Sequence, residues 1–141
     1  MFTINTDLHT HTVASGHAYS TVDEMAKGAF RKGIKLIAVT DHGPKMPGGP
    51  HSYHFGNFSI VPDHLYGVRI IKGVEANILD EGKLDLSAEV LDCLEFVSAG
   101  IHSLTGHNLQ NKEDYTRATI KAMENPYLDM ITHPVQKEYP I

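Results

Sequence analysis

The 141-residue chain has a single cysteine, no long apolar run and no excess of positive charge. One cysteine (Cys93) cannot close an internal disulfide, which excludes a disulfide scaffold and favours a reducing cytoplasm. A membrane-spanning helix needs about 20 consecutive apolar residues, and the sequence has no such run. Because the N-terminal sequence is polar by residue 5, we expect no secretory signal. A net charge of -5 argues against a general nucleic-acid binder, since those proteins carry a basic surface.

Low-complexity tracts, charge blocks and linker-like segments are also absent, so we expect one domain over residues 1–141. With 41% hydrophobic and 21% charged residues, the composition is that of an ordinary globular protein. The length argues against a closed eight-stranded (β/α)8 barrel, which needs about 200 residues or more. Histidine is the residue type in excess: there are 10 histidines against 12 lysines and arginines together.

Five short apolar runs rich in β-branched residues indicate buried strands. Helices are predicted between them at Thr21–Lys32 and Lys112–Glu124, with shorter and weaker helical patterns at Phe58–Tyr66 and Ser87–Leu91. This alternation favours an α/β fold with a parallel sheet built from βαβ units. The predicted strands are Phe2–Leu8, Ile34–Thr40, Val68–Val74, Leu94–Ile101 and Leu128–Thr132.

Each predicted strand ends in, or is soon followed by, a residue that can bind a metal ion. These residues recur about every 30 positions, which is the length of a βαβ unit. In parallel α/β folds the carboxyl ends of the strands share one face, so we expect the side chains to meet there. They are His9, His42, Glu75, His102 and His133.

Imidazole nitrogen and carboxylate oxygen are the ligands that zinc, manganese and iron accept from proteins. His11 lies two residues after His9 and points to the same side of an extended strand, so both can reach one ion. Glu75 has two oxygens and can bridge neighbouring ions. Asp7 and Asp41 lie just before strand-end histidines and are placed to orient imidazole rings.

A histidine at one strand end is, taken alone, more often a surface residue than a ligand, so the metal hypothesis depends on all five recurring together. The histidines without that spacing, which are His51, His54, His64 and His107, are interpreted as loop residues. Cys93 precedes an apolar strand and has no partner cysteine. We interpret it as a small buried hydrophobic residue rather than a nucleophile.

Five segments, taken in order, resemble the motifs of the PHP (polymerase and histidinol phosphatase) superfamily, and most closely its stand-alone bacterial probable-phosphatase branch. The resemblance spans nearly the whole chain and implies part of a distorted (β/α)7 barrel with up to three divalent metal ions. Zinc is the first choice, and manganese or iron are the alternatives. It also implies a phosphoesterase in which a metal-activated water attacks a small phosphorylated substrate. The segments are DLHTHTVASGHAYS, KLIAVTDHGP, IIKGVEANI, SAGIHS and MITHP.

The resemblance implies a role for each ligand. His9 and His11 would bind a first metal, and Glu75 would bridge it to a second. His102 and His133 would complete the protein ligands of that second metal. These five assignments agree with the reading of the strand ends.

A third metal would be held by His42 and by His17, and His17 joins the set through the resemblance alone. The family pattern continues past the THP motif and later supplies an Asp-x-His pair of ligands, which residues 1–141 do not contain. We therefore expect the chain to correspond to the N-terminal part of the family domain. A five-stranded parallel sheet also has an exposed edge, which favours self-association or completion by another chain.

Three functions stay open at this point. The first is a metal-dependent phosphoesterase, whose hydrolysis of a phosphate monoester would be lost on chelation. The second is a metal-binding but catalytically inactive protein, because missing ligands change both the geometry and the charge of a site. The third, a nuclease module allied to a polymerase, is disfavoured by the acidic surface and by the greater length of such chains. The number of ions bound per chain separates the first two.

Overall fold

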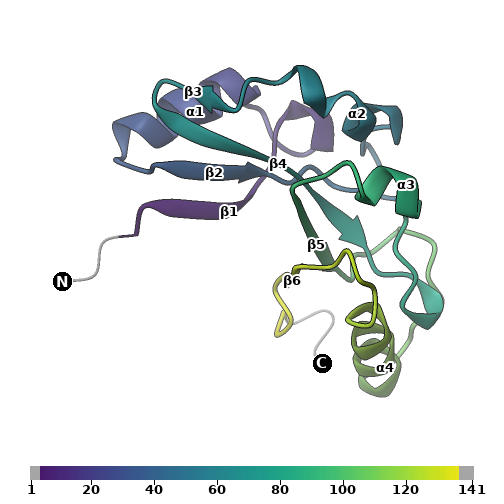
Figure 1. Ribbon diagram of the computed structural model, residues 1–141. Helices are drawn as coiled ribbons and strands as arrows, with labels where there is room; N and C mark the ends of the chain where they lie inside the picture. The colour runs from purple at the N-terminus through teal and green to yellow at the C-terminus, as the bar shows by residue number, and fades with distance from the viewer. Residues whose placement is uncertain (1–3, 137–141) are drawn as a thin grey trace.

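A single curled sheet is the main feature of the computed structural model, which describes residues 4–136 (Figure 1). The sheet order is β1-β2-β4-β5-β6, and neighbours along this path are parallel. A short additional strand, β3, pairs antiparallel with β4. The predicted α/β fold is confirmed as a partial TIM-like barrel. The strands are β1 Thr6–Thr10, β2 Leu36–Val39, β3 His64–Leu65, β4 Val68–Asn77, β5 Phe96–Gly100 and β6 Met130–Ile131.

The longest strand, β4, holds the two halves of the sheet together. Its first half pairs with β2, up to the pair Lys72 and Val39, and its second half pairs with β5 from Gly73 and Phe96 onwards. Because β4 changes partner part-way along, the sheet bends around it, and β5 and β6 diverge from β1 and β2 (Figure 1). Glu75 lies in the second half of β4, on the part that the curled sheet surrounds.

The helices begin and end where the local sequence directs them. Thr21 caps α1 and forms a reciprocal capping box with Glu24, while Gly33 adopts the positive φ of 76° that ends the helix region. Asn111 caps α4 by accepting the amide of Asp114. The main helices are α1 Val22–Arg31, α2 Tyr53–Gly56, α3 Ala88–Leu91 and α4 Lys112–Ala122, and the 3-10 turns are η1 Val13–Ser15, η2 Phe58–Ile60 and η3 Asp80–Gly82.

The predicted helical segment Phe58–Tyr66 is wrong. Only η2 is helical there, and the chain then extends into β3. Pro62 explains the change, because proline drives the residue before it into extended conformation, and Val61 has φ -75° and ψ 126°. The third predicted strand is also longer than expected: β4 continues to Asn77, so Glu75 is within the strand rather than after it.

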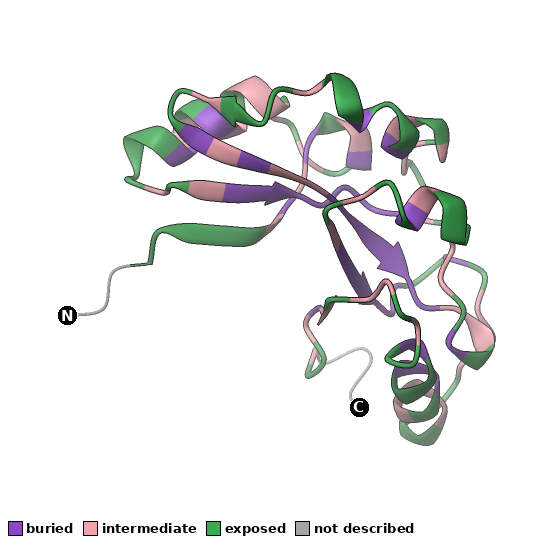
Figure 2. Cartoon of the chain, in the orientation of Figure 1, coloured by how far each residue is buried: buried purple, intermediate pink, exposed green. Residues whose placement is uncertain are grey.

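The core lies under β2, β4 and β5, which Figure 2 shows as mostly buried, whereas β1 is largely exposed. β1 and β6 lie at the two ends of the sheet order, in agreement with the expected open edges. Cys93 is a correction: it is exposed in the turn after α3, because the apolar segment that follows turns inward only from β5 onwards. No helix within residues 4–136 is long and apolar enough to cross a membrane.

Candidate metal centre

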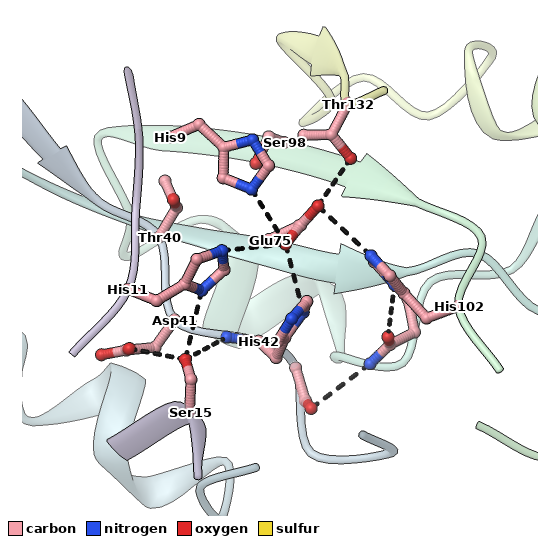
Figure 3. A network of polar contacts seen from close by, with 12 residues as sticks. His9, His11, Ser15, Thr40, Asp41, His42, Glu75, Ser98, His102 and Thr132 are labelled. Carbon is pink, nitrogen blue, oxygen red and sulfur yellow. Dashed lines mark hydrogen bonds and ion pairs between the residues drawn. The ribbon is translucent and has the colours of Figure 1, made fainter. Parts of the chain in front are cut away.

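The carboxylate of Glu75 lies at the centre of a group of imidazoles, as Figure 3 shows for His9, His11, His42 and His102. The predicted meeting of the strand ends is confirmed. His9 belongs to β1 and Glu75 to β4, and the other ligand candidates follow the ends of their strands. His42, three residues after β2, also forms an isolated parallel bridge with Glu75.

The two oxygens of Glu75 face different sets of side chains. Oε2 lies 3.1 Å from His9 Nε2, 3.3 Å from His11 Nε2 and 3.2 Å from His42 Nδ1. This arrangement confirms that His9 and His11 point to the same side of β1, as their spacing predicts. The register of the β1–β2 pairing shifts between Asp7 and Thr10, in the segment that carries His9.

Oε1 of Glu75 faces the other end of the sheet. It accepts a hydrogen bond from Thr132 Oγ1 at 2.7 Å and lies 2.8 Å from His133 Nε2 and 3.3 Å from His102 Nε2. These two imidazole nitrogens are themselves 3.3 Å apart. The carboxylate therefore lies between two groups of imidazoles, which is the position a bridging ligand requires.

Buried polar atoms in this group are left without hydrogen bonds. Glu75 Oε2 and His42 Nδ1 have no partner of acceptable geometry within residues 4–136, although imidazole nitrogens lie within 3.3 Å of that oxygen. Buried polar atoms are normally paired, and an unpaired buried carboxylate oxygen is costly. A divalent cation between the lone pairs would satisfy them, so the donor set fits metal ions.

Three groups of side chains offer ligand atoms that all lie within 4.8 Å of one another. Their membership differs from that implied by the resemblance: His11 groups with His17 and His42 rather than with His9, His133 groups with His9 rather than with His102, and His42 belongs to two groups. Here His11 stacks on His42 at a ring distance of 4.6 Å and is 5.0 Å from the ring of His17. His11 therefore lies between two groups, while still facing Glu75. The groups are His11, His17 and His42; His9, Glu75 and His133; and His42, Glu75 and His102.

Ser15 fixes which nitrogen of His11 faces the cluster. Its hydroxyl proton goes to Asp41 Oδ1 at 2.6 Å, because a carboxylate can only accept. Ser15 Oγ also accepts the His42 backbone N–H at 3.0 Å and lies 3.2 Å from His11 Nδ1. Because the Ser15 hydroxyl has already donated its proton to Asp41, His11 Nδ1 must be the protonated nitrogen. His17 is set in the same way, with Nδ1 3.2 Å from the Ser15 carbonyl oxygen. Both rings therefore have an Nε2 lone pair available for a metal.

The two aspartates expected to orient imidazoles act differently. Asp41 is fully buried and acts on His11 through Ser15, while it also accepts the backbone N–H of Thr12 at 2.7 Å. Asp7 is exposed and accepts the backbone N–H of His9 at 3.2 Å, so this hydrogen bond is with the main chain rather than the ring. Asp41 orients a ring and Asp7 shapes the backbone beside one.

The cluster shifts the pKa values of its members in opposite directions. Burial by itself would raise the pKa of Glu75, but the nearby imidazoles, His102 and His11 foremost, outweigh it and hold that pKa well below its usual range. Burial lowers the pKa of His42 to about 3. The contact with Glu75 raises the pKa of His9. The site therefore favours an ionised carboxylate and a neutral His42, the forms that bind metal.

The four histidines outside the predicted set have different positions. His51 and His64 are exposed, and the Nε2 of His107 donates to the His102 carbonyl oxygen at 3.1 Å. The interpretation of His54 and His64 as loop residues is wrong. His54 belongs to α2 and brings Nε2 to 3.3 Å from Asp41 Oδ2, and His64 belongs to β3.

Two buried residues of the site were missed from the sequence. Ser15 contacts His11, and Asn77 Oδ1 lies 2.9 Å from His102 Nδ1. The one sequence signal that marks them is that Ser15 lies in the segment DLHTHTVASGHAYS and Asn77 in the segment IIKGVEANI, both of which resemble family motifs.

Comparison with known proteins agrees with this geometry. The family model described as PHP domain matches residues 7–138. The chain belongs to the PHP domain family. Proteins named probable phosphatase are similar to this PHP domain over 96% of its length: those of Caldanaerobacter subterraneus subsp. tengcongensis and Acetivibrio thermocellus are each 53% identical, and that of Syntrophotalea carbinolica is 48% identical. The matched region covers 54% of the first relative and 56% of the other two, so this PHP domain spans about half the length of the curated relatives it matches.

Proposed function

We propose that this PHP domain takes part in a metal-dependent phosphoesterase that hydrolyses small phosphorylated molecules, with zinc as the first choice of metal and manganese or iron as alternatives. The observation that carries the proposal is the buried Glu75 carboxylate, whose Oε2 has three imidazole nitrogens within 3.3 Å and no hydrogen bond of acceptable geometry. The probable-phosphatase names of the relatives support the reaction class. The proposed ligands are His9, His11, His17, His42, Glu75, His102 and His133.

Bound divalent ions would lower the pKa of a water and neutralise charge on the phosphoryl oxygens. The chain supplies the positions for them. Glu75 presents one oxygen to His9 and His11 and the other to His102 and His133, which supports its role as the shared ligand. Ser15 keeps the ring of His11 turned so that Nε2 faces Glu75.

Metal content and hydrolysis measured on the same sample test this proposal. We expect divalent metal on elemental analysis, and hydrolysis of p-nitrophenyl phosphate that is lost with EDTA and restored by zinc or manganese. His102→Gln should lower both metal content and activity. His64→Gln is the matched control, because His64 is an exposed histidine on β3 and outside the cluster, and it should change neither. A folded, metal-loaded sample inactive on both monoesters and diesters would refute the proposal.

Two further measurements address the alternatives. A preference for bis(p-nitrophenyl) phosphate over the monoester would favour the nuclease reading. The native mass in solution tests whether a second copy pairs with the open edge at β1 or β6, since strands at a sheet edge are ready to pair. Three ions per chain together with a dimer mass would favour an enzyme completed by its partner chain.

A further inference from the structure

A carboxylate outside the cluster controls the orientation of a neighbouring asparagine. Asp85 lies between η3 and α3 and accepts three N–H groups. Its Oδ1 accepts the backbone N–H of Asn77 at 2.8 Å, and its Oδ2 accepts the side-chain Nδ2 of Asn77 at 2.6 Å and the backbone N–H of Lys45 at 2.9 Å. The carboxylate therefore holds the end of β4 against the loop that follows His42.

The side-chain amide of Asn77 has only one favourable orientation in this setting. Asn77 is fully buried, and its Nδ2 donates to Asp85 Oδ2 and, at 3.3 Å, to the carbonyl oxygen of Gly43. Turning the amide over would point its oxygen at a carboxylate and a carbonyl, which is repulsive. Oδ1 is consequently held toward His102, 2.9 Å from Nδ1.

The orientation of Asn77 decides the protonation of His102. Because Asn77 Oδ1 can only accept, His102 Nδ1 carries the proton and Nε2 keeps its lone pair. That lone pair faces Glu75 Oε1 and His133 Nε2, each at 3.3 Å. In the other tautomer Nε2 would carry a proton at this place and could not bind a metal there.

We propose that Asp85 and Asn77 are positioning residues that fix the tautomer of His102 from outside the metal cluster. Asp85 acts only through Asn77, and its role in metal binding rests on the proposed function, whereas the tautomer itself does not. Gly43 is part of the arrangement: a Cβ built on it would lie 2.3 Å from Asp85 Oδ1 and 2.5 Å from Oδ2. Glycine is needed there to give the carboxylate room.

The variant Asp85→Asn provides a sharp test because it keeps the shape and replaces one acceptor oxygen by an NH2 group. The new amide offers one oxygen to three N–H groups and its NH2 group opposes at least one of them, so the hold on the Asn77 amide is weakened and a fraction of the Asn77 side chains should turn their own NH2 group toward His102 Nδ1. The population of His102 should then shift from Nδ1–H toward Nε2–H. Long-range ¹H–¹⁵N spectra of histidine-labelled, metal-free full chain at about pH 8, above the ordinary histidine pKa, report this directly. His102→Gln assigns the signals.

Asp80→Asn is the matched control. Asp80 also accepts the backbone N–H and the side-chain Nδ2 of one asparagine, Asn108, each at 2.7 Å, but that asparagine has no hydrogen bond to a cluster imidazole. Asp80→Asn disturbs the same kind of carboxylate–asparagine hydrogen-bond pair and should leave the His102 signals unchanged. Gly43→Ala displaces the Asp85 carboxylate without removing any polar group. It should shift the His102 tautomer in the same direction as Asp85→Asn, so a failure of one variant to fold leaves the other as a test.

Metal titration of the same proteins completes the experiment. Asp85→Asn should weaken one class of zinc site about 10–100-fold, as is usual when the partner of a metal-binding histidine is lost, and Asp80→Asn should not. A His102 tautomer in folded Asp85→Asn that is identical to that of the wild type, or a protonated Nε2 in the wild type, would overturn the positioning role. If the wild type binds no zinc but its tautomer responds as described, the proposed function fails while the positioning role stands.

Discussion

Replacing Ser15 by alanine should destabilise the protein far more than its size suggests. Ser15 is fully buried, and its hydroxyl donates to Asp41 Oδ1 at 2.6 Å, accepts the His42 backbone N–H at 3.0 Å and contacts His11 Nδ1 at 3.2 Å. A methyl group satisfies none of these three. The space released is smaller than a water molecule, so solvent cannot replace the hydroxyl.

The expected cost follows from the groups left unpaired. A buried polar group without its partner costs about 1–3 kcal/mol. The buried His42 backbone N–H loses its acceptor and bears the whole of this cost. The His11 ring N–H is partly exposed, so its loss costs less, and Asp41 keeps its two hydrogen bonds from Thr12. We therefore expect Ser15→Ala to lower the free energy of unfolding by about 3–5 kcal/mol, a large part of the ~5–15 kcal/mol that holds a domain folded.

Ser98→Ala is the matched control for this prediction. Ser98 is also fully buried, but its hydroxyl donates to a neutral backbone oxygen, the Val74 carbonyl, at 2.9 Å. Its loss should cost about 1 kcal/mol. Urea unfolding of the two metal-free variants measures both values, and only Ser15→Ala should also weaken zinc binding, by about 10–100-fold. Equal costs, or unchanged zinc affinity in Ser15→Ala, would refute the role assigned to this hydroxyl.

Four further outcomes are expected. Burial lowers the pKa of His42 to about 3, so between about pH 6.5 and pH 3 this residue binds a proton in the unfolded chain but not in the folded one. The free energy of unfolding of the metal-free protein should therefore fall as the pH drops below about 6.5. A urea-unfolding series over pH measures this, and His42→Gln should flatten that part of the series. Zinc at 100 times its Kd should add about 2.7 kcal/mol and raise Tm by about 5–10 °C, reversibly with EDTA, if binding is confined to the folded state. Gly100→Ala places a Cβ 2.9 Å from His133 Cε1 and should cost about 1–3 kcal/mol and weaken zinc binding. Gly28→Ala within α1, where nothing lies within 4 Å of the added Cβ, should instead stabilise by about 0.5–1 kcal/mol in thermal melts.

The parts of the fold that depend on local pattern could be predicted from the sequence. Strands and helices alternate with their own periodicities, and the order of a parallel βα chain then places the strand ends on one face. This order predicts that the side chains of His9 and Glu75, far apart in sequence, lie close together, and His9 Nε2 is 3.1 Å from Glu75 Oε2. The capping residue of α1 and its closing glycine also act over a few residues, which is why the predicted helix Thr21–Lys32 lies within one residue of α1 at each end.

The groups that orient the ligands could not be predicted, because their partners are distant in sequence. Asn77 reaches His102 and Ser15 reaches Asp41, and each pair is 25 or more residues apart with no periodic spacing. A serine or asparagine near a turn is ordinary in composition, so nothing local distinguishes these from others. Cys93 shows the converse error: an apolar neighbourhood in sequence suggested burial, but the turn after α3 exposes it.

The use of neutral groups between carboxylate and imidazole has a consequence for metal binding. A carboxylate directly against an imidazole stabilises its protonated form, as Glu75 does for His9, whose pKa is raised. Asp41 and Asp85 instead act through Ser15 and Asn77, each of which accepts a hydrogen bond from a ring N–H without placing a full charge beside that nitrogen. In a cluster of closely packed imidazoles, where added positive charge repels incoming cations, this arrangement fixes the ring orientation and directs the Nε2 lone pair into the cluster without placing a second carboxylate beside the ring.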